Sequence, residues 1–328
     1  MRQMSPNFGP ISRLVSALAI CLTVALIPAV TLAQGTRDKD APRRIFGLPF
    51  LGHERLVVND VFGDRYDRWR TGSVASSYIF GSEWTGALPT RPGALVEFRV
   101  LGEVIAPARL DLNWTGDRPY SQALSFGLHS HFARGGWDIA AGADAVITGP
   151  QVHLIDFQHW LHRVTRFDHT ASALVRASQI PNGVHGSAVI EAGRSYTLAD
   201  GARLRPFVEL RGGVEDMVRV GFDFALGPAG EGELMVRDPV TGFRYRAVRR
   251  APDGITFVAG ADVAHVGQSL YLPAARNQIT DARTRVRLGM HWQKDRWRGF
   301  YGLTWLGPEF KGQYEGQLIG GLRISYQY

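Results

Sequence analysis

Apolar and polar side chains alternate residue by residue through most of the chain after about residue 55. In one clear segment, Val218 and Val220 fall on one face, and Arg219 and Asp223 fall on the other. Successive side chains of a β-strand point to opposite faces of its sheet, so this period of two predicts strands. The same pattern recurs in residues 204–211, 285–292 and 318–328. We therefore expect an all-β fold.

The length and composition of these segments indicate a membrane barrel. Each runs for about ten residues, has one apolar face, and carries aromatic residues near its ends, as is typical of outer-membrane strands. The second face is charged and predicts a lumen filled by ion pairs, which argues against an open pore. Its residues are Arg203, Arg205, Glu209, Arg211, Arg219, Asp223, Asp262, Arg285 and Arg287. A periplasmic β-sandwich stays the alternative, because a soluble sheet also alternates.

Segment counting predicts an antiparallel transmembrane β-barrel of about twelve strands. Their expected centres are residues 58, 76, 98, 125, 142, 189, 207, 221, 260, 288, 302 and 322. With both termini in the periplasm, odd-numbered strands run outward. The connections near 60–71 and 149–182 then lie together at the cell surface.

The N-terminal region predicts export. Residues 1–33 form a signal peptide, with basic Arg2 and Arg13, an apolar stretch and a small-residue cleavage pattern. Residues 34–54 form a polar lead-in, and residues 55–328 form the barrel. The single cysteine, Cys21, lies in the signal, so the mature chain has no disulfide. The net charge of +7 becomes +5 without the two signal arginines (7 − 2); export makes nucleic acid an improbable partner, and an anionic membrane surface fits better.

The segment Gly149–Val164 interrupts the strand pattern. Leu154 and Leu161 recur at helical spacing, while Gln158 and His162 are four residues apart on another face. We expect a short surface-loop helix near 151–164 that forms one wall of an active site. The alternative is that His162 is packed or solvated without a chemical role.

Oxygen-bearing side chains gather in the first surface connection. Asn59 and Asp60 stand at a strand end and face Asp64, Asp67 and Thr71 across a turn. Carboxylate and amide oxygens suit a hard cation such as Ca²⁺. An Asp-rich turn without a metal is the alternative, because Asn, Asp and Gly are common turn residues.

Other catalytic signatures are missing or incomplete in the sequence. No Gly-x-Ser-x-Gly elbow supports a serine esterase, and no phosphate-binding glycine loop occurs in a suitable context. A zinc site from His159 and His162 has no third ligand at a recognisable spacing.

Several short motifs, in this order along the chain, resemble the outer-membrane lipid A 3'-O-deacylases. They are Asn59-Asp60, Asp67-Arg68-Trp69-Arg70-Thr71-Gly72, Asp117-Arg118-Pro119-Tyr120-Ser121, Gly149-Pro150, Gln158-x-x-x-His162, Gln179-Ile180-x-Asn182 and Glu309-Phe310. The resemblance implies a twelve-stranded barrel with its site between the wall and a surface-loop helix. It also implies Ca²⁺-dependent hydrolysis of the ester that carries the 3'-linked acyloxyacyl group of lipid A.

The resemblance also assigns expected roles to individual residues. Asn59, Asp60 and Thr71 match active-site positions of the family, as do Gln158 and His162, and we expect Asn59 and Asp60 to surround the metal. In the mechanism that we infer, His162 is the general base and Thr71 and Gln158 give polar support. Asp168 falls where the family tends to carry an acidic residue. Arg109 is the nearest candidate for a family lysine, and Arg70 departs from the aromatic residue that relatives often have.

The expected substrate is anionic, so surface arginines are candidate phosphate ligands. We assign this role to Arg68, Arg70 and Arg109. The expected partners are lipid A or lipopolysaccharide and outer-membrane lipids, with a monomeric protein in the bacterial outer membrane and its site at the extracellular side. The alternatives are a non-enzymatic barrel, either structural or a narrow pore, and an outer-membrane phospholipase.

Overall fold

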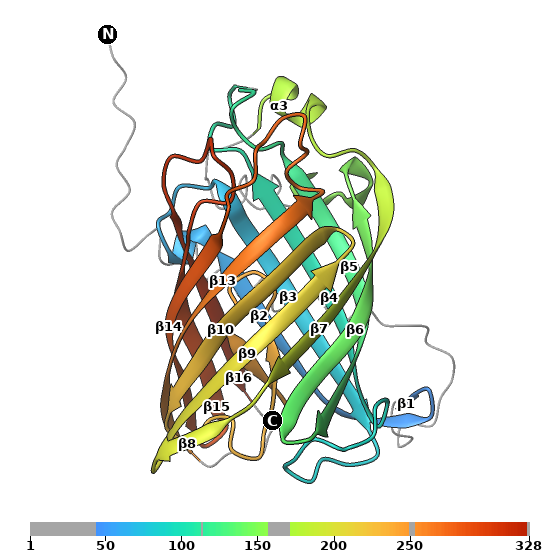
Figure 1. Cartoon of the computed structure of the whole chain (residues 1–328), viewed down its shortest axis with the longest axis vertical. Helices are drawn as coiled ribbons and strands as arrows, with labels where there is room; N and C mark the ends of the chain where they lie inside the picture. Colours follow the sequence, from blue (N-terminus) through green and yellow to red (C-terminus); the bar gives the residue numbers. More distant parts are fainter. Residues whose placement is uncertain (1–43, 113, 157–170, 249–252, 327–328) are drawn as a thin grey trace.

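The computed structural model describes residues 44–112, 114–156, 171–248 and 253–326, which form a closed antiparallel β-barrel (Figure 1). The barrel strands are β2 (Leu48–Asn59), β3 (Trp69–Gly81), β4 (Leu95–Ala106), β5 (Ser121–Arg134), β6 (Trp137–Thr148), β7 (Gly183–Gly193), β9 (Ala202–Gly212), β10 (Glu215–Leu226), β13 (Gly254–Ser269), β14 (Arg283–Lys294), β15 (Trp297–Leu306) and β16 (Gln317–Tyr326). Two short strands, β1 (Arg44–Ile45) and β8 (Tyr196–Ala199), pair with β2 and β9. The prediction of a twelve-stranded antiparallel barrel is confirmed.

The barrel closes between its first and last strands. Residues 57–59 of β2 pair with residues 320–322 of β16, and the other edge of β2 pairs with β3. This closure leaves no open sheet edge and excludes the β-sandwich. β2 begins at Leu48, inside the segment 34–54 expected to be a lead-in. The prediction rested on the charged residues at 37–44, and the wall begins soon after them. Glu54 of β2 is buried on the lumenal side, where it pairs with Arg323.

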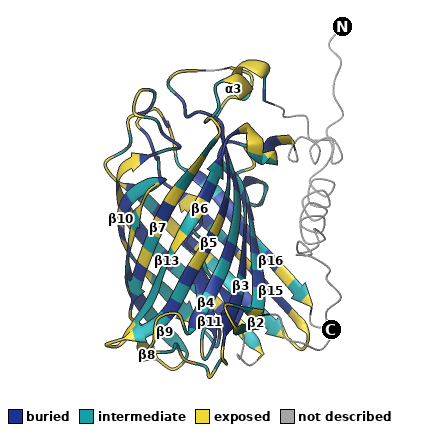
Figure 2. Ribbon diagram, turned by 90° about the vertical axis from the view of Figure 1, so that its right-hand side faces the viewer, coloured by how far each residue is buried: buried dark blue, intermediate teal, exposed yellow. Residues whose placement is uncertain are grey.

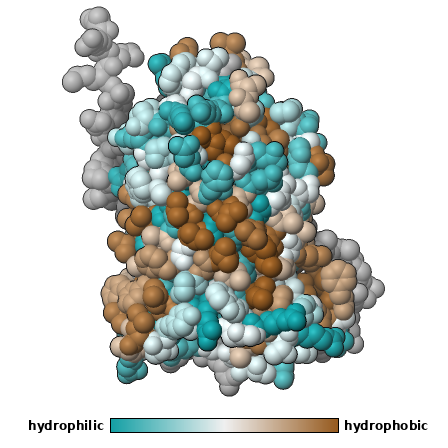
Figure 3. Space-filling view, viewed as in Figure 1, coloured by the Kyte–Doolittle hydropathy of each residue, from teal (hydrophilic) through white to brown (hydrophobic). Residues whose placement is uncertain are grey.

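The two faces of the wall carry the predicted chemistry. Buried and exposed positions alternate along the strands (Figure 2). Val218, Val220 and Phe222 are exposed outward, and apolar side chains gather across the middle of the barrel in Figure 3. Between them, Arg219 points inward and lies 3.2 Å from Asp262. The charged face therefore lines a lumen filled by ion pairs.

The helical segments gather at one end of the barrel, here called the helix end (Figure 1). They are the 3₁₀ helices η1 (Asp60–Phe62) and η2 (Pro150–Val152), a helical stretch over residues 154–156, and α3 (Ala173–Ala177). Because every neighbouring pair of barrel strands is antiparallel, the connections β2–β3 and β6–β7 share this end, as predicted. None of the helices in the described ranges is long and apolar enough to span a membrane.

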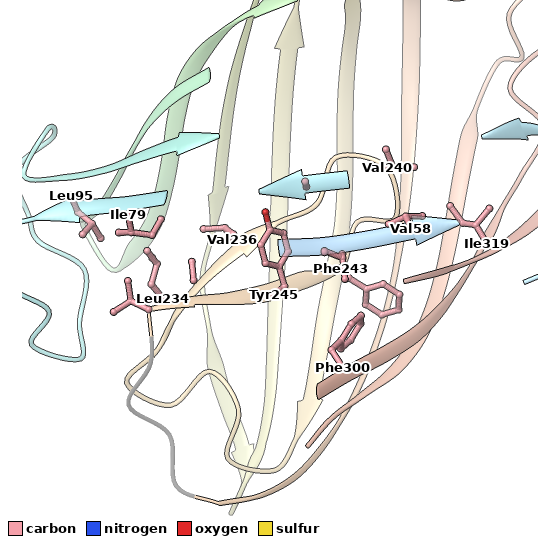
Figure 4. Close-up of a cluster of buried hydrophobic side chains, with 14 of the residues drawn as sticks. Val58, Ile79, Leu95, Leu234, Val236, Val240, Phe243, Tyr245, Phe300 and Ile319 are labelled. Carbon is pink, nitrogen blue, oxygen red and sulfur yellow. The ribbon is translucent and has the colours of Figure 1, made fainter. Parts of the chain in front are cut away.

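A hairpin from the opposite end fills the lumen. It is formed by β11 (Leu234–Arg237) and β12 (Arg244–Val248) within the β10–β13 connection, and we call residues 234–248 the plug hairpin. Figure 4 shows Val236, Phe243 and Tyr245 among wall residues, and these side chains form one buried apolar cluster. The alternation predicts barrel strands only, so it missed this hairpin.

Two wall glycines, in a row of three, make room for the plug hairpin. Gly289, Gly302 and Gly321 lie in direct register across β14, β15 and β16. A Cβ on Gly302 would lie 2.5 Å from the ring of Phe243, and one on Gly289 would lie 3.1 Å from it. The phenyl ring therefore packs on bare backbone, which any side chain at these positions would obstruct.

Candidate active site at the helix end

Asn59 is a polar residue on the outer, lipid-facing side of the wall. Its neighbour Val58 belongs to the lumenal apolar cluster, so the alternation turns Asn59 outward. Asn59 pairs with Gly72 on one side and with Gly320 on the other. The positions that flank Asn59 on both neighbouring strands are therefore glycines, which have no side chain.

This outward row continues across the next two strands. Gly72 of β3 is in register with Val104 of β4, which is in register with Gln122 of β5. At about 4.8 Å between strands, Gln122 lies roughly 14 Å from Asn59 along the wall. The row thus joins the candidate metal position to the strand that anchors the helix-bearing connection.

Asp60 follows Asn59 and is 1 % exposed. Its Oδ2 accepts a hydrogen bond from the backbone N–H of Arg68 at 3.1 Å, whereas its Oδ1 is buried without a hydrogen-bond partner. Burial raises the pKa of Asp60 well above its usual value, and the nearby carboxylates of Asp67 and Asp64 raise it further. The hydrogen bonds from Arg68 and Thr71 oppose this shift without reversing it. Asp60 is thus a carboxylate whose ionised form needs additional positive charge.

A β-bulge places Thr71 beside these carboxylates. Trp69 pairs with Ala106 and Gly72 with Val104, so Arg70 and Thr71 together stand against one residue of β4. Such a bulge re-aims side chains next to functional sites. The Thr71 hydroxyl donates to Asp67 Oδ1 at 2.5 Å and also hydrogen bonds to Asp60. Asp60, Asp67 and Thr71 therefore lie close together, as predicted.

The fit of this site to a divalent cation is partial. An orphaned buried Asp60 oxygen among carboxylates is the arrangement that a cation would relieve. The Asn59 side-chain oxygen already accepts from the Val61 N–H at 2.8 Å, as the cap of η1, but retains a second lone pair. Among the described residues, no three acidic, histidine or cysteine side chains converge closely enough to complete a metal site. Asn59 and Asp60 can supply ligands, and further ligands must come from elsewhere.

The helix-bearing connection is fastened to the outer wall by Gln122. Its Oε1 accepts from the Ile155 N–H at 3.1 Å, and its Nε2 donates to Gln179 Oε1 at 3.1 Å. Nearby, the Ile180 N–H donates to the carbonyl of Tyr120 at 2.8 Å. Both described ends of the connection therefore attach to β5 and the residue before it.

Apolar contacts hold the start of the helical stretch on the same wall. Ile155 is buried with Tyr120 and Val175, and Val104 packs against this cluster. Leu154 lies 3.6 Å from where a Cβ of outward-facing Gly102 would stand. The stretch at 154–156 thus packs on the outside of the barrel, beside the row that begins at Asn59. Gln158, His162 and Asp168, three of the predicted catalytic residues, lie outside the described residues.

Two of the three predicted phosphate-binding arginines are engaged inside the protein. Arg68 is 5 % exposed, donates to Tyr314 and Glu315 at 2.7 Å each, and lies 4.3 Å from the ring of Trp69. Arg70 points into the lumen and pairs with Glu103 and Glu309. The bulge at Arg70 turns its charge inward, which alternation could not reveal. We therefore assign structural roles to both side chains.

Arg109 differs because it stands in solvent at the helix end. Its side chain is 59 % exposed and forms a bidentate contact with Asp111, which is also exposed. An exposed ion pair of this kind contributes little to stability. Arg109 is therefore accessible to an anionic ligand.

The motif residues Arg118 and Glu309 form a buried ion pair that joins the β4–β5 and β15–β16 connections. Burial alone would raise the pKa of Glu309, but Arg70, Arg118 and Arg283 together hold it well below its usual range. The adjacent Phe310 packs with Trp69 and Leu272. These motif residues close the helix end over the lumen.

Sequence analysis missed Gln122 and the partnership of Arg118 with Glu309. Gln122 occupies an outward strand position where the alternation calls for an apolar residue, as Asn59 does. A polar residue on the lipid face near a strand end is the signal that could have found it. The Arg118–Glu309 pair spans 191 positions and carries no local signal.

No protein-family model and no curated protein sequence matches this chain. Among solved structures, the chain is similar to LpxR from Salmonella typhimurium, with a TM-score of 0.67, 17% identity, and coverage of 84% of this chain and 100% of that one. The β domain of the Bordetella autotransporter BrkA gives 0.40 at 8% identity, covering 84% and 99%, and the NanC porin gives 0.36 at 6%, covering 85% and 98%. The likeness to LpxR concerns the fold: a closed outer-membrane-type barrel of twelve strands.

Proposed function

We propose that this protein is an outer-membrane hydrolase that removes the 3'-linked acyloxyacyl group of lipid A by Ca²⁺-dependent ester hydrolysis. The observation that carries the proposal is the place of Asn59 and Asp60. Asn59 faces outward, and the buried Asp60 beside it has one oxygen without a partner. The sequence motifs that resemble lipid A 3'-O-deacylases and the LpxR-like fold support the same reading.

The outward direction of Asn59 suits a lipid substrate. Acyl chains lie against the apolar outer face of an outer-membrane barrel, whereas a soluble substrate would reach residues in the lumen or on the surface connections. An ester at the polar end of the acyl chains would meet the wall near the helix end. There, the outward row has a polar amide at each end, Asn59 and Gln122, with Gly72 and Val104 between them.

Asn59 and Asp60 would hold the calcium ion, whose charge, when it is bound, stabilises negative charge that develops on the ester oxygen. Thr71 keeps its hydroxyl on Asp67 and Asp60 and so fixes both carboxylates. Removing the Thr71 hydroxyl would leave those carboxylates less well oriented.

The remaining roles rest on the motif resemblance. His162 takes a proton from the attacking water, Gln158 orients the substrate or the water, and Asp168 supports the imidazole. The anchorage of residues 154–156 and 179–180 to β5 supports these roles, since it fixes both ends of the connection that carries them. Arg109, which is exposed at the same end, is our remaining candidate for a lipid A phosphate.

Mass spectrometry of lipid A tests the proposal. Purified barrel in detergent is incubated with lipid A, with Ca²⁺ or with a chelator, and we expect loss of the acyloxyacyl mass only with Ca²⁺. Asp60→Asn and His162→Ala should each lower the rate by about 10²–10⁴-fold, the usual range for a lost general base or charged catalytic group. Asp281→Asn, at an exposed position of the same end, is the matched control and should keep full activity.

The same assay separates the alternatives. Hydrolysis of purified phospholipid with intact lipid A would replace the proposal by an outer-membrane phospholipase. Intact lipid A and phospholipid, from barrel whose heat-modifiable gel mobility shows that it is folded, would leave a non-enzymatic barrel.

A further inference from the structure

A cavity lies inside the barrel between the plug hairpin and the helix end. Its volume is about 90 Å³, and its lining includes Pro239 and Val240 at the tip of the hairpin and Tyr271 and Glu309 from the connections above. A single buried water needs only about 10–15 Å³. The cavity therefore has room for several waters or for one small polyatomic ion.

The unsatisfied polar atoms around this cavity are all hydrogen-bond donors. Of the lining residues, the buried side-chain atoms with neither a hydrogen bond nor an ion pair are Nε and Nη2 of Arg283 and Nη2 of Arg285. The carboxylates of the lining are already engaged: Glu215 accepts from Arg283 and Ser269, and Glu309 accepts from Arg70 and Arg118. The lining therefore has more free N–H donors than free carboxylate oxygens to accept from them.

The side chains that line the cavity carry more positive than negative charge. Six arginines and four carboxylates line the cavity. Three carboxylates behind this layer compensate four of the arginines. Asp262 lies 3.2 Å from Arg219 and 2.9 Å from Arg285. Glu97 pairs with Arg99, and Glu209 pairs with Arg211 and Arg219. Arg283 has Glu215 as its hydrogen-bonded partner, through Nη1 alone. A buried guanidinium with idle N–H groups is costly unless a further acceptor is present.

We propose that the cavity binds a small tetrahedral oxyanion, represented by inorganic phosphate. An oxyanion offers only acceptor lone pairs, which match a set of idle donors, and arginine binds phosphate through paired N–H groups. Water would satisfy the donors but brings two donors of its own. A lipid headgroup cannot enter a lumen whose wall is closed and whose opposite end is filled by the plug hairpin, so the ligand is the free ion.

The bound anion would also stabilise the plug hairpin. Arg285 donates through Nη1 to the carbonyl oxygens of Pro239 and Val240, at 2.9 and 3.1 Å, while its Nη2 is idle at the cavity. An anion held by Nη2 would fix the same guanidinium that holds the hairpin tip. The site therefore has a structural consequence that is independent of lipid hydrolysis.

Phosphate binding by the whole mature barrel tests the proposal. Barrel folded into detergent in phosphate-free buffer is equilibrated with ³²P-labelled inorganic phosphate, and we expect saturable binding of one ion per barrel. The melting temperature should rise with the logarithm of the phosphate concentration. Sulfate should compete, because it has the same shape and acceptor set.

Variants at Arg283 show where the ion binds. Arg283→Gln should weaken phosphate binding at least 10-fold, and Arg283→Lys, which keeps the charge but loses the planar fork, should weaken it less. Arg134→Gln, at an exposed arginine of the opposite end, is the control and should bind as the parent does.

Absence of saturable binding in the parent barrel would mean that water fills the cavity and would overturn the proposal. Unchanged binding in Arg283→Gln would also overturn it, by placing the ion elsewhere. If Arg283→Gln does not fold, Arg283→Lys takes its place. No saturable binding in the parent barrel, or unchanged binding in Arg283→Lys, would then overturn the proposal.

Discussion

At the scale of single residues, two buried carboxylates of the helix end have opposite surroundings. Glu309 lies among three arginines, which hold its pKa well below the usual range. Asp60 is buried beside Asp64 and Asp67, and its pKa is raised well above the usual value. Glu309 is therefore ionised and structural. Asp60 keeps its proton to a higher pH than an ordinary aspartate does, which makes its properties depend on metal and on pH.

The raised pKa of Asp60 predicts a specific pH dependence. Its contribution to folding stability is fully present below the ordinary pKa of 3.8 and is lost as the pH rises through the higher folded value. Without Ca²⁺ at neutral pH, Asp60→Asn should therefore melt higher than the parent, by roughly 2–4 °C for each ~1 kcal/mol regained. Calcium should stabilise the parent more strongly as the pH rises and should not stabilise the variant. Calorimetry of the detergent-solubilised barrel measures both, and an Asp60→Asn variant that melts lower than the metal-free parent would contradict this account.

At the scale of secondary-structure elements, the plug hairpin and the wall that receives it are matched. Phe243 packs over Gly302 and Gly289, and Phe243 and Phe300 contact edge to face with ring centroids 4.9 Å apart. Arg237 of the same hairpin pairs with Glu191 and Asp223 on the opposite part of the wall. The hairpin therefore bridges two sides of the barrel, one through apolar contacts and the other through ion pairs.

Adding a methyl group at Gly302 should weaken this fit. In Gly302→Ala the new Cβ would lie 2.5 Å from the rigid ring of Phe243, so the hairpin must shift. We expect a loss of about 1–3 kcal/mol, the usual cost of overpacking. Gly186→Ala in β7 is the matched control, because a Cβ added there would have no neighbouring atom within 4 Å, and it should change little. Urea unfolding of the two variants in detergent, followed by tryptophan fluorescence, compares them; equal midpoints would show that Phe243 does not depend on the bare glycine surface.

At the scale of the whole molecule, the chain is a closed wall around a filled interior. The plug hairpin occupies the lumen from one end, and the buried pair Arg118–Glu309 joins connections over the other. Apolar side chains face outward over the middle of the barrel (Figure 3). This organisation suits work on the outer face of the wall better than transport through it.

A filled lumen predicts that the protein does not conduct ions. Reconstituted in a planar bilayer at moderate voltage, the parent should show no steady channel current. Deleting residues 230–250, which include the plug hairpin, removes its filling of the lumen and should produce channels, provided that the shortened barrel keeps its heat-modifiable mobility. A steady open level in the parent protein would favour the narrow-pore alternative instead.

The sequence determined the strands and where they lead. A period of two depends only on backbone geometry, so the strand centres, the antiparallel order and the shared end of the β2–β3 and β6–β7 connections could be derived from residues alone. The motifs also brought Asp60, Asp67 and Thr71 together correctly, because all three fall within residues 60–71. The roles of Gln158, His162 and Asp168 stay predictions.

Only the tertiary structure decided which polar residues serve the interior. A one-residue bulge turns Arg70 from a candidate substrate ligand into a lumenal ion-pair partner, and the alternation has no means of showing an extra residue. Arg118 contacts Glu309, and Phe243 of the plug hairpin packs on Gly289 and Gly302, through contacts between residues far apart in the chain. Strand period and turn chemistry are local properties that a sequence displays directly, whereas ion pairing and packing across a lumen depend on the closed barrel bringing distant strands together.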